Sequence, residues 1–219
     1  MYAPDHFRIS DPMVLRDAAR RIGAGHLTTV GPEGPVSSFV PLLVSDDAHV
    51  VRGHLARANP QWRTSDPTMS ALLTWVGPDA YVSPSWYPSK AEHGRVVPTW
   101  DYIAVQVRGP VTFHTDDSWT RALVAELTDT HEAGSDDPWS VDDAPDGYID
   151  RTVRSVVGFD VRVTALEGSW KLSQNRSAQD VAGVVAGMRA RSDAGRSAAV
   201  ADAVEAVDGL GRRPDVGSD

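Results

Sequence analysis

The chain has 219 residues, with 41% hydrophobic residues, 23% charged residues and a formal net charge of −9. This composition is ordinary for a folded domain with a substantial core, and no stretch resembles a membrane span or a signal peptide. The absence of cysteine excludes disulfides, thiolate nucleophiles and cysteine-ligated metals, and it favours a cytoplasmic location. The acidic charge argues against a broad DNA-binding surface, since phosphate contacts need clustered basic residues.

The N-terminal quarter of the chain predicts a helix, a hairpin and a third strand. Asp11 and Pro12 open an amphipathic pattern that predicts a helix ending at Gly23. Asn59 is expected to cap a short helix with Pro60 at its first position. Between the two helices, the alternating apolar pattern predicts strands at 26–30, 35–44 and 48–55.

The rest of the chain continues with short strands and a few amphipathic helices. Strands are expected at 69–76, 80–86, 102–114 and 156–168. Helices are expected at 115–132, 148–154, 178–191 and 197–208, with an acidic surface loop at 133–147. This pattern predicts a mainly β protein built as a barrel, with residues 1–192 as its domain and 193–219 as a low-complexity tail, partly helical or disordered.

The segment GHLARANPQWR (53–63) is the most informative motif in the chain. His54 and Arg57 stand beside the helix start at Asn59, and backbone N–H groups at a helix start favour an anion. Trp62 follows one turn later, so the anion is expected to belong to a flat molecule such as a phosphorylated planar cofactor. The alternative is structural: Asn59 only caps the helix, Trp62 anchors the core and Arg57 is solvated.

Two aromatic segments, SPSWYPSK (83–90) and VPTWDY (97–102), are separated by a short loop. A hairpin would bring Trp86 beside Trp100, forming a wall suited to stacking against a planar ring. Thr99 adds a small polar donor that a purely apolar core does not need. The alternative is that these aromatic residues belong to the core or to strand edges.

The segment WKLSQNR (170–176) places several donors directly after a predicted strand. Lys171, Ser173 and Arg176 are candidates for lining a ligand pocket, although such residues are also common in surface loops. The sequence contains no recognisable nucleophile, acid–base pair or metal-ligand spacing, so no catalytic residue is assigned and no metal site is expected. His54 is the best histidine candidate for a ligand contact because it belongs to the first motif.

Six motifs occur together in an order that closely resembles the PaiB family, across roughly residues 1–190. They are MYAPDHF, GHLARANPQWR, GPDAYVSPSWY, VPTWDYIAVQVRG, VGFDVRV and KLSQNR. The resemblance implies a mainly β, α+β fold: an FMN-binding split β-barrel similar to pyridoxamine-phosphate oxidases. It also implies a homodimer with cofactor sites at the subunit interface.

On this resemblance, the FMN phosphate would meet His54, Arg57 and Asn59. The flavin ring would be surrounded by six residues: Trp86, Thr99, Trp100, Lys171, Ser173 and Arg176. The family is described as negative transcriptional regulators, and a bound flavin also makes redox activity possible, so whether the protein is an enzyme stays open. The alternative cofactor is haem, because piperazate synthases, which form an N–N bond, have similar sequences; His54 would then be the axial ligand.

Overall fold

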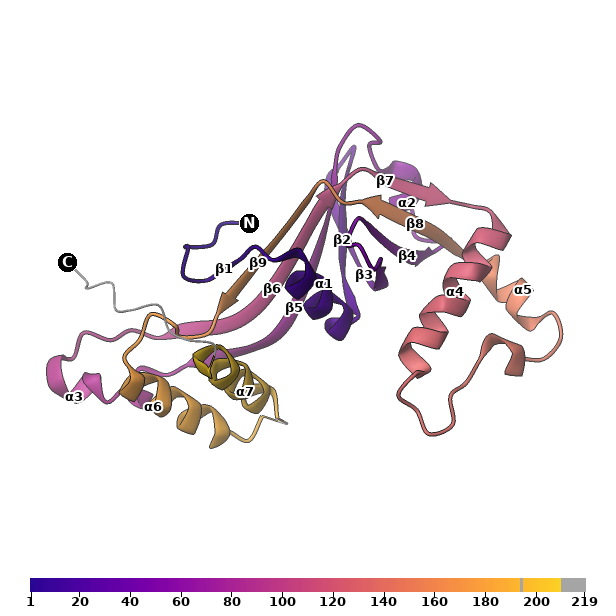
Figure 1. The fold of residues 1–219 in the computed structure, drawn as a ribbon. Coiled ribbons are helices and arrows are strands. Elements are labelled where there is room, and N and C mark those ends of the chain that lie inside the picture. The colour runs from indigo at the N-terminus through magenta and orange to yellow at the C-terminus, as the bar shows by residue number, and fades with distance from the viewer. Residues whose placement is uncertain (194, 210–219) are drawn as a thin grey trace. The chain divides into compact units, whose positions relative to one another are not determined.

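The computed structural model describes residues 1–193 and 195–209, which form two compact units. The first unit contains Met1–Ser10, Val76–Val105 and the described part of Glu167–Asp219. The second contains Asp11–Trp75 and Gln106–Leu166. Figure 1 labels the elements of both units.

The second unit is built on antiparallel strands in the order β5-β2-β3-β4-β8-β7. They are β2 Ala24–Gly31, β3 Gly34–Val44, β4 Val50–Ala56, β5 Ala71–Val82, β7 Val111–His114 and β8 Val156–Arg162. Its helices are α1 Pro12–Ile22, α2 Gln61–Thr64, α4 Asp117–Glu132 and α5 Tyr148–Val153, with a short 3-10 turn at Val141–Asp143. The α4 side chains Leu123 and Leu127 pack with Leu43 of β3, so this helix covers one face of the sheet.

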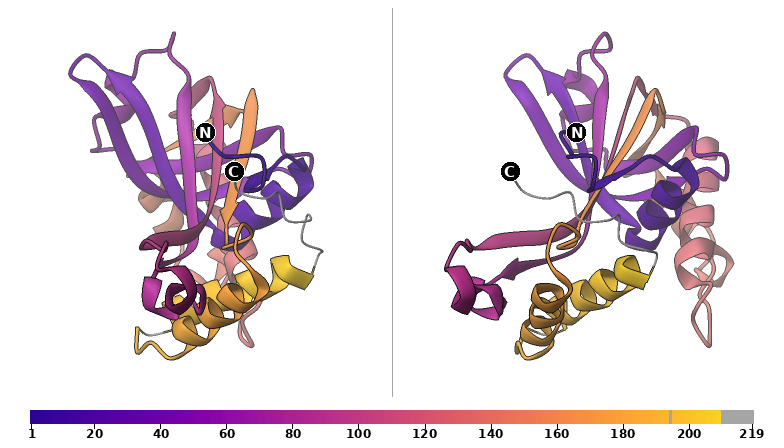
Figure 2. Two further views of the ribbon diagram at one scale, coloured as in Figure 1. Left: turned by 90° about the vertical axis from the view of Figure 1, so that its left-hand side faces the viewer. Right: turned by 60° about the vertical axis from the view of Figure 1, so that its left-hand side comes forward.

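The first unit has the strand order β1-β9-β6-β5, and β5, β6 and β9 carry residues of both units. Its further elements are β1 Arg8–Ile9, β6 Thr99–Gly109, β9 Ala165–Lys171, a 3-10 turn at Pro84–Trp86, α3 Ser89–His93, α6 Ala178–Arg189 and α7 Arg196–Gly209. Helices α6 and α7 lie side by side in Figure 1 and Figure 2. Their contact is apolar because Val184, Met188 and Val200 are fully buried.

The helix prediction based on Asp11 and Gly23 is confirmed. Asp11 Oδ1 accepts the Met13 N–H at 2.8 Å, and α1 ends at Gly23, whose φ of 77° suits glycine. The expected helix at 197–208 lies within α7. Residues 210–219, the end of the expected tail, lie outside the described residues. No helix in the described parts of the chain is long and apolar enough to cross a bilayer.

Four strand predictions are wrong in their boundaries. The ranges 69–76 and 80–86 belong largely to one strand, β5, which runs through Pro78. The ladder between β5 and β2 ends at Thr74, so the missing N–H of Pro78 does not interrupt it. The range 102–114 is instead two strands, β6 and β7, because the chain breaks at Pro110.

The expected long strand 156–168 is also two strands, β8 and β9. The break falls at Val163 and Thr164, where no glycine or proline signals it. The Val163 N–H donates to the carbonyl of His49, whereas the Thr164 N–H donates to the carbonyl of Arg108, both at 2.8 Å. The chain therefore changes partner strands between two adjacent residues, a change that only tertiary pairing determines.

Candidate functional site

The start of α2 is organised by Asn59 and Gln61. Asn59 Oδ1 accepts the Gln61 N–H at 2.9 Å, while its Nδ2 donates to Ser38 Oγ at 2.8 Å. The helix begins at Gln61, one residue later than expected, and Pro60 takes the N-cap position instead of the first helical position. Both ends of the Asn59 amide are thus engaged in holding the helix start against β3.

Gln61 is an important residue that the sequence interpretation missed. Its side chain is only 1% exposed, and its Nε2 lies 3.1 Å from the Leu27 carbonyl, Thr29 Oγ1 and the Val36 carbonyl. Ser38 Oγ donates to Gln61 Oε1 at 2.6 Å. A buried amide needs such partners, and here they attach α2 to β2 and β3. No local signal distinguishes this glutamine from a solvated one.

His54 of β4 lies on the sheet face that α4 covers. The strand register pairs His54 with Gly158, where a methyl group would lie only 2.2 Å from the Trp119 ring of α4. His54 Nδ1 is buried without a hydrogen-bond partner. Burial lowers the pKa of His54 below its ordinary value, so the imidazole is neutral at pH 7. The site therefore holds an unsatisfied polar atom.

Arg57 follows β4 and extends toward the start of α4. Its Nε donates to the Arg154 carbonyl at 2.7 Å, and its Nη2 lies 3.9 Å from Asp117 Oδ1. The Arg154 guanidinium lies 3.4 Å from the same carboxylate. Two guanidiniums thus flank one half-exposed carboxylate. The three predicted phosphate contacts, His54, Arg57 and Asn59, have separate partners and share none of the hydrogen bonds described.

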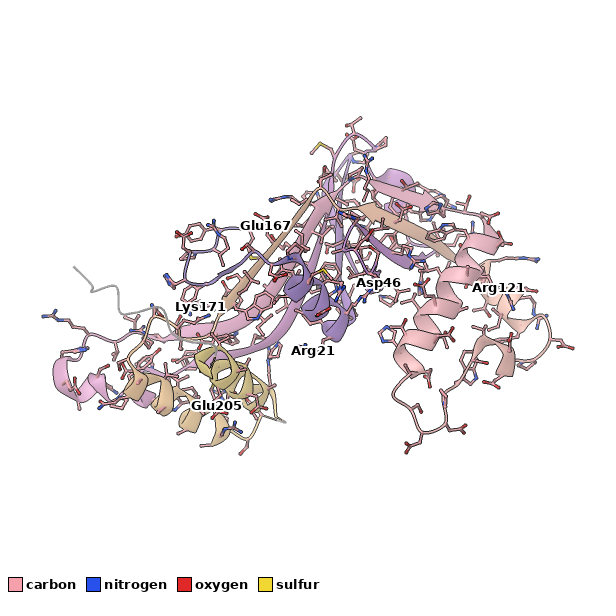
Figure 3. All side chains as sticks on the ribbon, in the orientation of Figure 1. Arg21, Asp46, Arg121, Glu167, Lys171 and Glu205 are labelled. Atoms are coloured by element: carbon pink, nitrogen blue, oxygen red, sulfur yellow. The ribbon has the colours of Figure 1, made fainter. Side chains whose placement is uncertain are left out.

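In the first unit, Lys171 at the end of β9 contacts three successive residues at the start of β6. Its Nζ donates to Thr99 Oγ1 at 2.7 Å and to the Trp100 carbonyl at 2.6 Å, and it lies 3.3 Å from Asp101 Oδ1. Ser173 Oγ donates to Asp101 Oδ2 at 2.6 Å. The side chain of Lys171 is labelled in Figure 3. The structure therefore brings together four of the six residues predicted to surround a flavin ring.

Asp101, which joins these donors, was missed as a site residue. Its side chain is completely buried, and this burial raises the pKa of its carboxyl, while the bond from Ser173 and the charge of Lys171 oppose that rise. Ser173 adopts a φ of 61°, a backbone conformation that is uncommon for a non-glycine residue. The available signal was an aspartate at an inward-facing position of an otherwise apolar strand.

Arg176 and Trp86 have other surroundings within the first unit. The Arg176 guanidinium lies over the ring of the buried Tyr87, 4.8 Å from its centroid. The Trp86 ring packs against Gly187 of α6, where a methyl group would lie 2.3 Å from the indole. Gly183, one turn earlier, similarly admits the Trp86 carbonyl. The two glycines four residues apart on α6 were the missed signal for this packing.

Trp100 lies on the opposite face of β6 from Asp101, because successive strand residues point to opposite sides. Its side chain is 46% exposed, although its Nε1 donates to Asp79 Oδ1 at 2.8 Å. Tyr81 approaches edge-on, with 6.2 Å between ring centroids. The indole is thus oriented by a carboxylate and an aromatic neighbour while much of its surface faces solvent.

The described residues contain no group of three or more histidines, cysteines and carboxylates arranged to hold a metal ion. A hollow of about 290 Å³ lies among α1, β3 and α4, bordered by Arg20, Leu42, Glu126 and His131 among others. None of the residues predicted to bind the cofactor lines it. The polar and aromatic side chains predicted to bind a cofactor therefore lie in two regions, one with Trp100 and Lys171 and the other with His54 and Arg57.

The antiparallel sheet with its flanking helices defines a protein of the split-barrel class. Residues 1–165 match the family described as "Putative FMN-binding domain". The chain is 30% identical over 187 residues to "Protease synthase and sporulation protein PAI 2" of Bacillus subtilis (strain 168), covering 84% of this chain and 87% of that protein. The chain belongs to the PaiB family.

Solved structures support the fold. The flavocytochrome Anf3 of Azotobacter vinelandii superimposes with a TM-score of 0.57 and 10% identity, covering 80% of this chain and 75% of that one. The FAD and heme binding protein of Mycobacterium smegmatis gives a TM-score of 0.54 and 12% identity, covering 80% and 78%. At these identities the likeness concerns the fold alone.

Proposed function

We propose that this protein binds FMN and acts as a flavin-dependent redox protein or as a flavin-binding regulator. The observation that carries the proposal is Trp100, whose indole is held in a defined orientation with much of its surface exposed. A planar, largely apolar ring is the ligand that such a surface stacks against. Membership of a family described as FMN-binding supports the choice of flavin. The redox chemistry of such a protein is that of the cofactor, which the chain binds and orients.

In this proposal Trp100 and Tyr81 contact the flavin ring. Lys171 fixes the backbone of Trp100, since its Nζ donates to the Trp100 carbonyl and to Thr99 Oγ1. Ser173 extends this support through Asp101, which both Ser173 and Lys171 contact. Arg176 is included in the proposal on the family resemblance, and its guanidinium lies over the Tyr87 ring. Trp86 is left out of the ring contacts because α6 occupies its indole face. A preorganised support of this kind keeps a binding surface in its productive geometry.

For the phosphate we propose Arg57 and His54 as contacts, with Asn59 holding the helix start nearby in the chain. The donor set fits an anion: His54 Nδ1 is buried and unpartnered, and the Arg57 guanidinium retains donors that are not used by the Arg154 carbonyl. A bound phosphate would replace the Asp117 carboxylate as the anion that pairs with the Arg57 guanidinium.

Replacing Arg57 by alanine is expected to weaken FMN binding by about 2 kcal/mol, or roughly 30-fold in Kd, the scale of a lost charge-assisted hydrogen bond. The measurement is a fluorescence titration of FMN with the wild-type protein and the variant. Arg63→Ala is the matched control, because Arg63 stacks over Trp62 on the exposed side of α2. Equal affinities of the Arg57→Ala and Arg63→Ala proteins would refute the assignment of Arg57.

The cofactor itself is tested by the visible absorption spectrum before and after separate additions of FMN and haemin. Flavin bands that persist after desalting are expected. A protein that stays colourless after FMN addition would contradict the proposal. A Soret band that disappears in His54→Ala would replace flavin by haem.

Haem is the weaker alternative. A histidine that ligates a metal normally donates its other ring N–H to a carboxylate, carbonyl or water, which fixes the ring. His54 Nδ1 has no such partner in the described chain. The heme of the FAD and heme binding protein of Mycobacterium smegmatis belongs to that protein and does not transfer at 12% identity.

The redox and regulatory forms of the proposal differ in their partners. A redox protein would turn over a reduced nicotinamide donor, whereas a regulator would shift operator DNA in a salt-dependent, sequence-selective manner. The net charge of −9 favours the redox form or an indirect regulatory role. The proposal includes a homodimer, for which the exposed Phe39 on β3 offers apolar surface.

A further inference from the structure

Arg196, the first residue of α7, forms a two-pronged ion pair with Asp79 of β5. Its Nη2 lies 2.6 Å from Asp79 Oδ1 and 2.7 Å from Oδ2, and its Nε donates to the Asp79 carbonyl at 3.2 Å. The side chain of Asp79 is only 18% exposed, whereas that of Arg196 is 61% exposed. A single arginine thus holds both the carboxylate and the backbone of one strand residue.

The same carboxylate orients Trp100. Asp79 Oδ1 accepts the indole N–H of Trp100 at 2.8 Å while it accepts from Arg196. The other end of Trp100 is held by Lys171, which donates to its carbonyl at 2.6 Å. Trp100 is therefore fixed through its backbone and through its ring nitrogen, although the ring remains 46% exposed.

Helix α7 presents Arg196 from a well-anchored position. Val200, Ala201 and Val204 of α7 are buried, and Arg189 of α6 pairs with Asp202 and Glu205 of α7 at 2.7 and 2.8 Å. The helix is docked by these contacts independently of Arg196, so its attachment does not depend on the ion pair with Asp79. Docking of the helix therefore does not account for the placement of the Arg196 guanidinium on the carboxylate that orients the exposed indole.

We propose that Arg196 is a positioning residue that acts through Asp79 to hold the Trp100 indole ready to stack on the flavin ring. This inference rests on the proposed function, and it implies that α7 contributes to the ligand site through Arg196. The helix lies beyond residues 1–165, the part matched by the family model. Restricting the indole to one orientation before binding lowers the entropy lost on association.

The positioning itself is tested without any ligand by the indole ¹⁵N–¹H resonances of the seven tryptophans, with Trp100 assigned from Trp100→Phe. In Arg196→Gln the Trp100 indole resonance is expected to shift and its proton to exchange faster with water. Arg189→Gln is the matched control, since it removes the guanidinium that joins α6 to α7 but contacts no group of Asp79. An unchanged Trp100 resonance in Arg196→Gln, or an equal change in both variants, overturns the inference.

The consequence for binding is measured by FMN titration of the same proteins. Arg196→Gln is expected to raise the Kd for FMN about tenfold, with Arg189→Gln close to wild type. Equal FMN affinities of the wild type and Arg196→Gln would overturn the role of Arg196 in the ligand site. Failure of the wild type to bind FMN would instead overturn the proposed function, while the indole resonances would still decide whether Arg196 positions Trp100.

Discussion

Replacing Gly109 by alanine is expected to lower the free energy of unfolding by about 3 kcal/mol or more. Gly109 ends β6, and a methyl group there would lie 1.8 Å from the carbonyl oxygen of Arg162. The obstacle is backbone, so no side-chain rotation relieves it. The chain would have to separate at the β6–β7 junction, where Pro110 already restricts the backbone. Urea unfolding followed by circular dichroism measures the effect.

Gly134→Ala is the matched control for this substitution. Gly134 lies in the loop after α4, where a methyl group would meet no atom within 4 Å. Its effect should stay within about 0.5 kcal/mol, the usual range for an unconstrained surface position. If the two variants unfold at the same urea concentration, the close approach between Gly109 and Arg162 is not a determinant of stability.

Replacing Asp101 by alanine is expected to cost about 3 kcal/mol, because it leaves Lys171 and Ser173 without their shared buried acceptor. Asp101 accepts from Ser173 at 2.6 Å and lies 3.3 Å from Lys171 Nζ. Asp101→Asn is the matched control, since its amide oxygen still accepts from Lys171 and its amide nitrogen can donate to Ser173. It should cost about 1 kcal/mol or less, the scale of one altered hydrogen bond. Equal losses in the two variants would contradict this account of the network.

The wild type and the Asp101→Asn protein also test how the free energy of unfolding depends on pH. Burial raises the pKa of Asp101 above its ordinary value of 3.8, so the folded state binds a proton more tightly than the unfolded state. The stabilisation linked to this proton is fully present below pH 3.8 and is lost as the pH rises through the folded-state pKa. The stability of the wild type relative to Asp101→Asn should therefore fall as the pH rises from about 4 to 7. A rise over this range would show that Lys171 and Ser173 outweigh burial.

Helix ends and the family were predictable from the sequence. The cap at Asp11 and the stop at Gly23 depend on hydrogen bonds between residues at most four positions apart. The face of α4 that carries Leu123 and Leu127 likewise follows from helical periodicity. The six PaiB motifs are also linear strings, so they identified the family without knowledge of any contact. Strand boundaries were less predictable, as the unsignalled break between β8 and β9 shows.

The roles of individual site residues depended on tertiary structure. Asn59 was expected beside a phosphate, yet its amide is bound to Ser38 and to the α2 backbone. Trp86 was expected to face a flavin, but the space left by Gly187 accommodates its ring. In both cases the partner of the side chain came from a distant segment that the motif does not contain.

The sequence by itself determined the family and the fold class, because those properties are encoded in local patterns and in motif order. The tertiary structure alone decided that Asp101 joins Lys171 to Ser173 and that Arg196 reaches Asp79 across 117 positions of the chain. The physical reason is that a hydrogen bond requires two atoms within about 3 Å. For residues so far apart in the chain, strand pairing and helix docking set that distance.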